Sequence, residues 1–172
     1  MTNQRILIAC IGNIFLGDDG FGVEVARRLA GRPLPPGVVL KDFGIRSFDL
    51  TYALLDPWDL VILVDACSRG DKPGSVYLIE PDPVEETGAV GGHQSVDPHG
   101  MKPLSVLRMV KCMGGPPNRT LVVGCEPADL GSDEEGKLGL SEPVEAAIDE
   151  AMKLIEKTVS ESLDSKPVEA VS

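Results

Sequence analysis

The chain has 172 residues, a formal net charge of −11 and a hydrophobic fraction of 42%, which suit one domain with one sizeable core. The acidic balance argues against nucleic acid or an anionic membrane surface as a partner, because both demand a basic face. No apolar run reaches the roughly 20 residues that span a bilayer, and the N-terminus lacks a signal-peptide core, so we expect a cytoplasmic protein.

Apolar runs and helical spacing predict the order strand, helix, strand, helix, strand, strand, loop, helix, strand, helix. The predicted strands are 5–11, 37–43, 60–64, 75–80 and 120–125. The predicted helices begin near Phe21, at a cap of Ser47 or Asp49, at Pro103 and at a cap of Ser141. We expect a single domain over residues 1–160, followed by a disordered tail over residues 161–172.

This order predicts an α/β fold, a three-layer sandwich with a mostly parallel sheet of about five strands and helices on both faces. The strand at 75–80 follows its predecessor with no room for a crossover helix, so it should pair antiparallel at an edge. In such sheets ligands bind beyond the carboxyl ends of the strands. If the first and third strands are neighbours, as in a flavodoxin-like order, Asp18 or Asp19 faces Asp65 there.

The segment that links the first strand to the first helix is rich in glycine and acids. It reads IGNIFLGDDGFG from Ile11 to Gly22. Two adjacent carboxylates would repel a phosphate, but they offer hard oxygen ligands to a divalent metal. The G-x-G-x-x-G register is also absent, so a dinucleotide site is set aside.

Three further residues, Asp65, His93 and His99, could complete a site with these acids, and the acidic candidates also have plainer explanations. Asp19 could simply cap the helix or favour its dipole. Asp65 ends an apolar strand, where a carboxylate is costly unless it is paired, but a bond to nearby backbone would also satisfy it. His93 and His99 lie in the long loop over residues 81–102. Either imidazole would complete an O,O,N site suited to a transition metal, and His99 is favoured because a helix follows it closely.

The four cysteines, Cys10, Cys67, Cys112 and Cys125, form no C-x-x-C pair. A structural zinc site and a thioredoxin-type motif therefore both fail on spacing, and free thiols are expected. Cys67 is the nearest candidate nucleophile to Asp65, but no base can be placed beside it.

Several motifs, in order from residue 4 to about 158, match one family. They are GNIFLGDDGFG (12–22), GIRSFDL (44–50), VDA (64–66), DPHGMKP (97–103), VGCEP (123–127) and GLS (139–141). With them the chain closely resembles the hydrogenase maturation proteases, the endopeptidases that trim the C-terminal extension from the nickel-loaded precursor of a [NiFe] hydrogenase large subunit.

The resemblance implies a flavodoxin-like or phosphorylase/hydrolase-like α/β sandwich that binds no cofactor of its own. It implies that Asp19, Asp65 and His99 contact nickel supplied by the substrate, and that Asp19 and Asp65 are catalytic. Many relatives carry Glu at the Asp19 position, which changes the reach of the side chain but not its ligand chemistry. The implied partner is the large-subunit precursor, with no nucleic acid and no membrane.

Two other functions would use the same candidate residues. A receiver-type signalling module would bind magnesium through Asp18, Asp19 and Asp65. It would need a Lys at the end of the last strand, where this chain has Val-Gly-Cys at 123–125. A non-catalytic nickel metallochaperone would use Asp19, Asp65 and His99 without cleaving anything.

Overall fold

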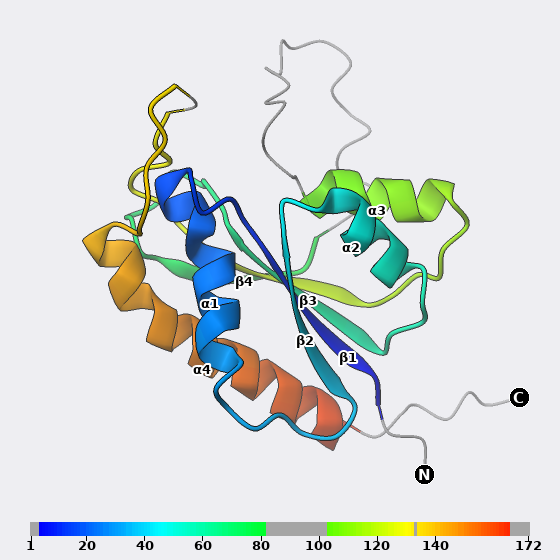
Figure 1. The fold of residues 1–172 in the computed structure, drawn as a ribbon. Coiled ribbons are helices and arrows are strands. Elements are labelled where there is room, and N and C mark those ends of the chain that lie inside the picture. Colours follow the sequence, from blue (N-terminus) through cyan, green and yellow to red (C-terminus); the bar gives the residue numbers. More distant parts are fainter. Residues whose placement is uncertain (1–3, 82–102, 133, 166–172) are drawn as a thin grey trace, which may run out of the picture.

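The computed structural model describes residues 4–81, 103–132 and 134–165, and these form one five-stranded sheet with helices on both faces (Figure 1). The strands are β1 (Ile6–Ile11), β2 (Val38–Gly44), β3 (Leu60–Ala66), β4 (Val76–Ile79) and β5 (Thr120–Cys125). The helices are α1 (Phe21–Leu29), α2 (Ser47–Leu54), α3 (Pro103–Cys112) and α4 (Glu142–Asp164), with a short 3-10 helix η1 (Gly17–Gly20) before α1.

The strand order is β2-β1-β3-β5-β4. Strands β1, β2, β3 and β5 are parallel, and β4 pairs antiparallel with β5 at the edge. The predicted fold class and the predicted edge strand are therefore confirmed. Because β1 and β3 are direct neighbours, whatever follows their carboxyl ends is brought together at one point of the sheet.

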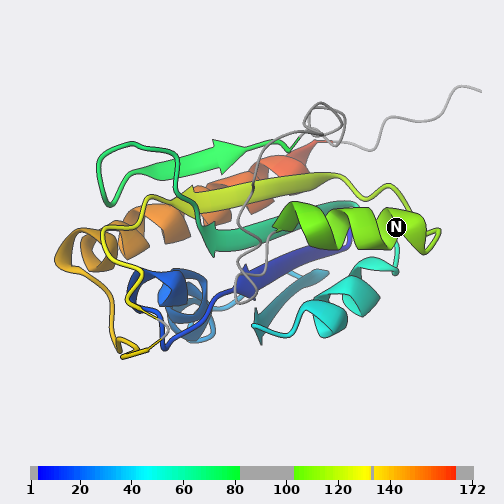
Figure 2. The same cartoon turned by 90° about the horizontal axis from the view of Figure 1, so that it is seen from above.

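The core is divided by the sheet into two layers of side chains that alternate along each strand. On β1, Ile6, Ile8 and Cys10 pack in the layer shared with α1 and α4. Leu7, Ala9 and Ile11 pack in the layer shared with α2 and α3. Figures 1 and 2 show the two helix pairs on opposite faces of the twisted sheet.

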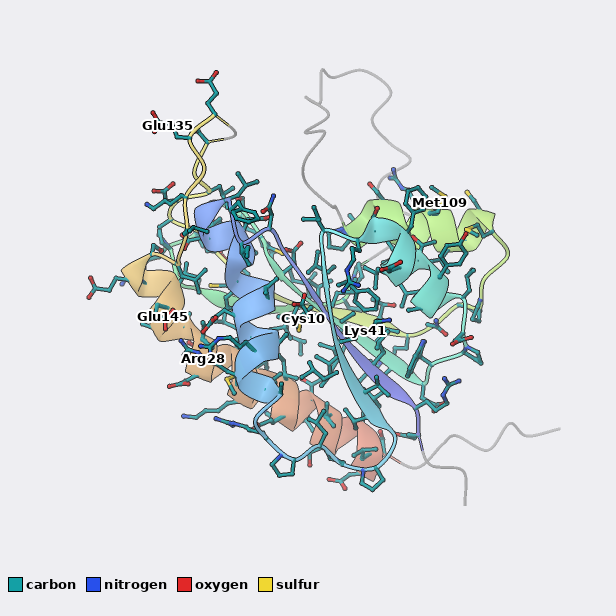
Figure 3. The ribbon with its side chains drawn as sticks, viewed as in Figure 1. Cys10, Arg28, Lys41, Met109, Glu135 and Glu145 are labelled. Carbon is teal, nitrogen blue, oxygen red and sulfur yellow. The ribbon has the colours of Figure 1, made fainter. Side chains whose placement is uncertain are left out.

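Helices α1 and α4 lie side by side and are joined at their surface by an ion pair. Arg28 of α1 reaches both Glu24 of its own helix and Glu145 of α4, and Figure 3 shows Arg28 and Glu145 next to each other. Such partly exposed pairs add little stability. The apolar contacts beneath them therefore dominate this interface.

Helix α1 approaches the sheet so closely that its second residue must be glycine. A Cβ on Gly22 would lie 2.2 Å from the carbonyl oxygen of Ile11 and 2.5 Å from that of Val64. The start of α1 therefore sits directly on the last residues of β1 and β3. This contact places η1, which precedes α1, at the carboxyl edge between those two strands.

The predicted side-chain caps of two helices are wrong, and one helix is longer than expected. Helix α2 starts at Ser47 with Arg46 in the N-cap position, and no side chain caps it, so neither Ser47 nor Asp49 does. Ser141 does occupy the N-cap position of α4, but its hydroxyl donates to Asp18 rather than to its own helix. Helix α4 continues to Asp164, past the expected boundary at residue 160. In the part of the chain that the structure describes, no helix combines the length and apolarity that crossing a membrane requires.

Candidate active site

Two carboxylates meet where β1 and β3 end. Asp65 is the second-last residue of β3 and lies opposite Gly124 of β5. Asp65 is only 6% exposed. Asp19 lies in η1, which contacts β3. Asp19 and Asp65 therefore lie close together at the carboxyl end of the sheet, where the strand order predicts a ligand site.

The environment of Asp65 disfavours its charged form. Burial raises the pKa of the Asp65 carboxyl well above its usual range, and the nearby charge of Asp19 raises it further. The backbone N–H of Ala66 acts in the opposite direction but does not offset these two effects. A desolvated carboxylate beside a second carboxylate is stabilised by an incoming cation. The pair is therefore suited to hold a positively charged group of a substrate.

The loop after β1 fixes the orientation of Asp19. The backbone N–H of Asn13 donates to Asp19 Oδ2 at 2.9 Å, and Asn13 Oδ1 accepts from the N–H of Phe15 at 3.0 Å. A Cβ added to Gly12 would lie only 2.1 Å from the carbonyl oxygen of Asp19, so the loop passes very close to the backbone of Asp19 here. Asn13 was not singled out by the sequence reasoning, and its inclusion in the motif at 12–22 was the only available signal.

Asp18 has a different role from its neighbour. It is fully buried, and its Oδ2 accepts hydrogen bonds from the backbone N–H groups of Ala128 and Asp129 at 2.8 and 2.9 Å. Ser141 donates to it twice, from its N–H at 2.7 Å and from its hydroxyl at 2.8 Å. Burial alone would raise the pKa of Asp18, but these donors lower it overall. Of the two adjacent acids, Asp18 anchors the 128–141 segment, and Asp19 is the one beside Asp65.

A third acid, Glu126, holds the turn that follows Asp65. It is 5% exposed and accepts hydrogen bonds from the N–H groups of Arg69 and Gly70 at 2.8 and 3.2 Å and from the Tyr77 hydroxyl at 3.0 Å. The donated hydrogen bonds lower the pKa of Glu126. Sequence reasoning missed this role, although a Glu directly after an apolar strand is a visible signal.

The histidine of the predicted site cannot be placed with the acids. Both His93 and His99 lie outside the described residues. Within residues 4–81, 103–132 and 134–165, no three side chains of His, Cys, Asp or Glu gather closely enough to hold a metal ion. The assignment of His99 as the third ligand therefore stays a prediction.

Cys67 lacks the properties of a nucleophile. Burial raises the pKa of the Cys67 thiol to about 12, and the charge of Asp65 adds to this effect. Because the thiolate is the reactive form, this thiol is inert at neutral pH. Its side chain instead packs in the layer shared with α2 and α3 and against Gly124.

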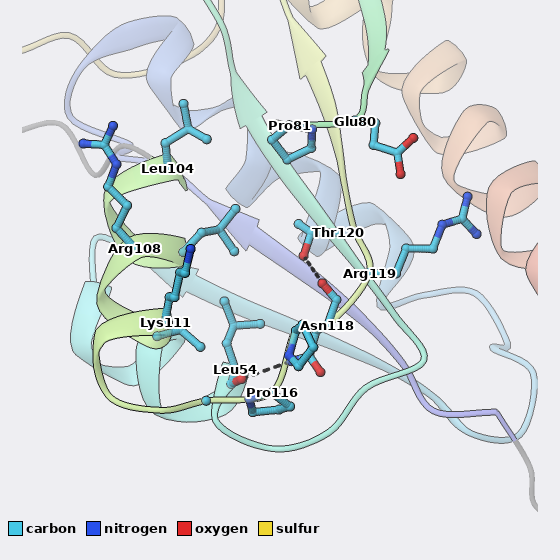
Figure 4. Close-up of a pocket in the computed structure, with 14 residues that line it drawn as sticks. Leu54, Glu80, Pro81, Leu104, Arg108, Lys111, Pro116, Asn118, Arg119 and Thr120 are labelled. Carbon is cyan, nitrogen blue, oxygen red and sulfur yellow. Dashed lines mark hydrogen bonds between the residues drawn. The ribbon is translucent and has the colours of Figure 1, made fainter. Parts of the chain in front are cut away.

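A separate cavity of about 580 Å³ lies at the other end of β5. Figure 4 shows it between α3 and the start of β5, with Thr120 and Asn118 at its floor and Arg108 and Lys111 on the helix. Thr120 begins β5, whereas Gly124, opposite Asp65, lies near its end. The cavity is therefore remote from the acid pair and takes no part in the site.

Comparison with known proteins identifies the family. The family model for hydrogenase maturation proteases matches residues 23–158. A putative hydrogenase maturation protease of Methanocaldococcus jannaschii is 32% identical over 157 residues, which cover 90% of this chain and 96% of that protein. The hydrogenase expression/formation protein HupD of Rhodobacter capsulatus is 31% identical over 153 residues, or 87% of this chain and 70% of that one.

A solved structure agrees with these sequence matches. The hydrogenase maturating endopeptidase HybD from Escherichia coli superimposes with a TM-score of 0.75 at 28% identity, covering 92% of this chain and 94% of that one. The matches leave no support for a receiver module, and β5 ends in Val123, Gly124 and Cys125 without the lysine that such a module requires. The chain belongs to the hydrogenase maturation protease family and is a hydrogenase maturation endopeptidase.

Proposed function

We propose that this endopeptidase removes the C-terminal extension of a nickel-loaded [NiFe] hydrogenase large-subunit precursor. We further propose that it recognises the nickel of that substrate through Asp19, Asp65 and His99. The observation that carries the proposal is the convergence of Asp19 with the buried Asp65 at the ends of two adjacent parallel strands. Two carboxylates, one of them buried, thus lie at the edge where α/β proteins bind ligands.

The chemistry of the donors fits a borderline transition metal. Two carboxylate oxygens and one imidazole leave further coordination positions for groups that the substrate brings. Burial strengthens the attraction between such a cation and Asp65, since the local dielectric is low. Nickel in this scheme belongs to the substrate, so the resting enzyme needs no metal of its own.

The acids also provide the catalytic function. Docking of the nickel beside the scissile bond would hold the reacting groups in place. The metal would polarise the carbonyl, and a carboxylate of the pair would accept a proton from the attacking water. Binding of the cation would favour the deprotonated form of Asp65 against its raised pKa, because a metal-bound carboxylate must be deprotonated. A precursor without nickel lacks this metal contact and is not cleaved.

Replacing each acid tests the proposal. Asp19→Asn and Asp65→Asn should each reduce the rate of precursor cleavage by at least about 100-fold, because general acid–base and metal contacts are lost together. Asp149→Asn, on the exposed face of α4, should leave the rate unchanged. Cleavage would be followed by the mass of the precursor. A double variant Asp19→Asn/Asp65→Asn that cleaves at the wild-type rate would overturn the proposal.

A further inference from the structure

Several large apolar side chains are exposed on the loop that orients Asp19 and on the segments bonded to it. Phe48 is 71% exposed, Phe15 and Ile45 are 61% exposed, and Leu138 is 72% exposed. Ile14 is also exposed. Together these five residues, Ile14, Phe15, Ile45, Phe48 and Leu138, are called the apolar rim here.

Backbone hydrogen bonds bring the three segments of the apolar rim side by side. The N–H of Gly12 donates to the carbonyl of Gly44 at 3.0 Å, which joins the loop after β1 to the turn before α2. The N–H of Lys137 donates to the carbonyl of Phe15 at 2.7 Å, which joins the same loop to the segment that carries Leu138. The rim is therefore continuous with the loop that orients Asp19.

The rim is held rigidly. Asn13 fixes the turn that presents Ile14 and Phe15 through its hydrogen bond to the N–H of Phe15. Arg46 fixes the turn that presents Ile45 and Phe48, since its guanidinium donates to the carbonyls of Asp42 and Phe43. An apolar surface on ordered turns loses little conformational entropy when it is covered. Apolar side chains exposed on adjoining segments, as these are, are typical of interaction sites in soluble proteins.

The charge around the rim favours an uncharged surface of the partner. Arg46 lies between Ile45 and the start of α2, and its charge is neutralised by an ion pair with Asp49 at 3.2 Å. The whole chain carries a net charge of −11, so the rim is an apolar patch on an acidic molecule. An apolar protein surface fits it better than a charged peptide does.

The size of the rim fits a transient complex rather than a permanent dimer. Five side chains of this size can bury on the order of 500 Å² on one partner, which is below the roughly 800 Å² per partner of a stable interface. A protein substrate that is handed on after cleavage requires such an interface.

We propose that the apolar rim docks an apolar surface of the folded large-subunit precursor and delivers the scissile bond to Asp19 and Asp65. This inference rests on the proposed function, because the loop that presents Ile14 and Phe15 also orients Asp19. The rim and the acid pair then have separate roles in binding and in recognition of nickel. The rim binds the precursor whether or not nickel is present, and the acids distinguish the loaded form.

Binding of nickel-free precursor isolates the rim from the metal contact. The full-length protein would be titrated onto immobilised nickel-free precursor, which is not cleaved. Phe15→Ala/Phe48→Ala should raise the Kd by about tenfold or more, in the range of buried aromatic hot spots, and Ile45→Glu should do the same by adding a charge. The matched control Leu78→Ala/Met113→Ala removes two exposed apolar side chains elsewhere and should leave the Kd unchanged. With loaded precursor, the rim variants should raise KM and leave kcat unaltered.

The outcomes separate this inference from the proposed function. An unchanged Kd for both rim variants, or no binding of precursor by the wild-type protein, would overturn the docking role while cleavage of loaded precursor still stood. Weakened binding without any cleavage of loaded precursor would overturn the protease proposal and support the rim. Self-association of the wild-type protein that the rim variants abolish, seen by sedimentation, would show that a second copy covers the rim and would overturn the inference.

Discussion

Asp19 lies close enough to Asp65 for its charge to raise the pKa of the Asp65 carboxyl, which burial already raises. Asp19 follows β1 and Asp65 lies near the end of β3, and the parallel pairing of these two strands brings them together. This arrangement is unfavourable in the absence of a cation, since two acids lie close together and Asp65 is buried. Sites of this kind trade stability for function.

The first prediction concerns the effect of Asp65 on the free energy of unfolding. The folded-state pKa of Asp65 is raised, so folding opposes ionisation of this carboxyl and costs stability above the unfolded pKa of about 3.9. This cost disappears below that pKa, where both states are protonated. Asp65→Asn should therefore increase the free energy of unfolding by about 0.5–2 kcal/mol at pH 7. The gain should shrink towards zero as the pH falls to about 3.5.

Chemical denaturation at both pH values measures this difference. Asp149→Asn on the exposed face of α4 is the control and should change neither value. A loss of stability in Asp65→Asn at pH 7 would show that the carboxylate is stabilising, contrary to this account.

The second prediction concerns Asp18, which should behave in the opposite way. Its pKa is lowered in the folded state by the donors from Ser141, Asp129 and Ala128. The stability that it supplies is present above the unfolded pKa of about 3.9 and is lost as the pH falls through the lower folded value. Asp18→Asn places an NH₂ group among hydrogen-bond donors and should cost about 2–3 kcal/mol at neutral pH.

Ser141→Ala provides the graded control, because it removes the hydroxyl donor but keeps the backbone N–H that also binds Asp18. It should cost about 1 kcal/mol. Thermal unfolding at pH 7 and pH 3 would test both variants. Equal stability of Asp18→Asn and wild type at pH 7 would contradict the anchoring role of Asp18.

The third prediction concerns the packing of α1 on the strand ends. A methyl group at Gly22 would meet the carbonyl oxygens of Ile11 and Val64 at 2.2 and 2.5 Å, and backbone cannot move aside as a side chain can. Gly22→Ala should destabilise the protein by about 1–3 kcal/mol and displace η1 with Asp19, so the rate of cleavage should fall as well.

Gly31→Ala is the matched control, since its nearest neighbour, the carbonyl oxygen of Arg28, would lie 3.6 Å from the new Cβ. It should leave both the unfolding midpoint and the rate of cleavage close to the wild-type values. If both glycine variants were equally stable, the close approach of α1 to β1 and β3 would be wrong.

Much of the architecture could be predicted from the sequence, because buried parallel strands appear as continuous apolar runs. That Asp18 or Asp19 would face Asp65 also followed from strand order, and the family resemblance pointed to Asp19. The separate role of Asp18 did not, since adjacent acids have the same local signal and only the tertiary contacts with Ala128, Asp129 and Ser141 distinguish them. The predicted capping hydrogen bond of Ser141 is absent for the same reason, because its hydroxyl donates to the carboxylate of Asp18, which is distant in the sequence.

The fourth prediction concerns the thiol beside the site. With its pKa raised to about 12, Cys67 is protonated at neutral pH and cannot act as the nucleophile. Cys67→Ala should cleave loaded precursor at a rate within about threefold of wild type, because a catalytic group would instead contribute about 100-fold or more. Loss of activity in a Cys67→Ala variant with an unchanged unfolding midpoint would revive a cysteine mechanism.

The central claim is that the acid pair senses nickel in the precursor. The measurement that tests it most directly follows the mass of a purified hydrogenase large-subunit precursor, loaded with nickel or free of it, during incubation with the protein. We predict a discrete loss of a C-terminal peptide from the loaded precursor and none from the nickel-free precursor. Equal cleavage of both forms, or cleavage of neither, would contradict the claim.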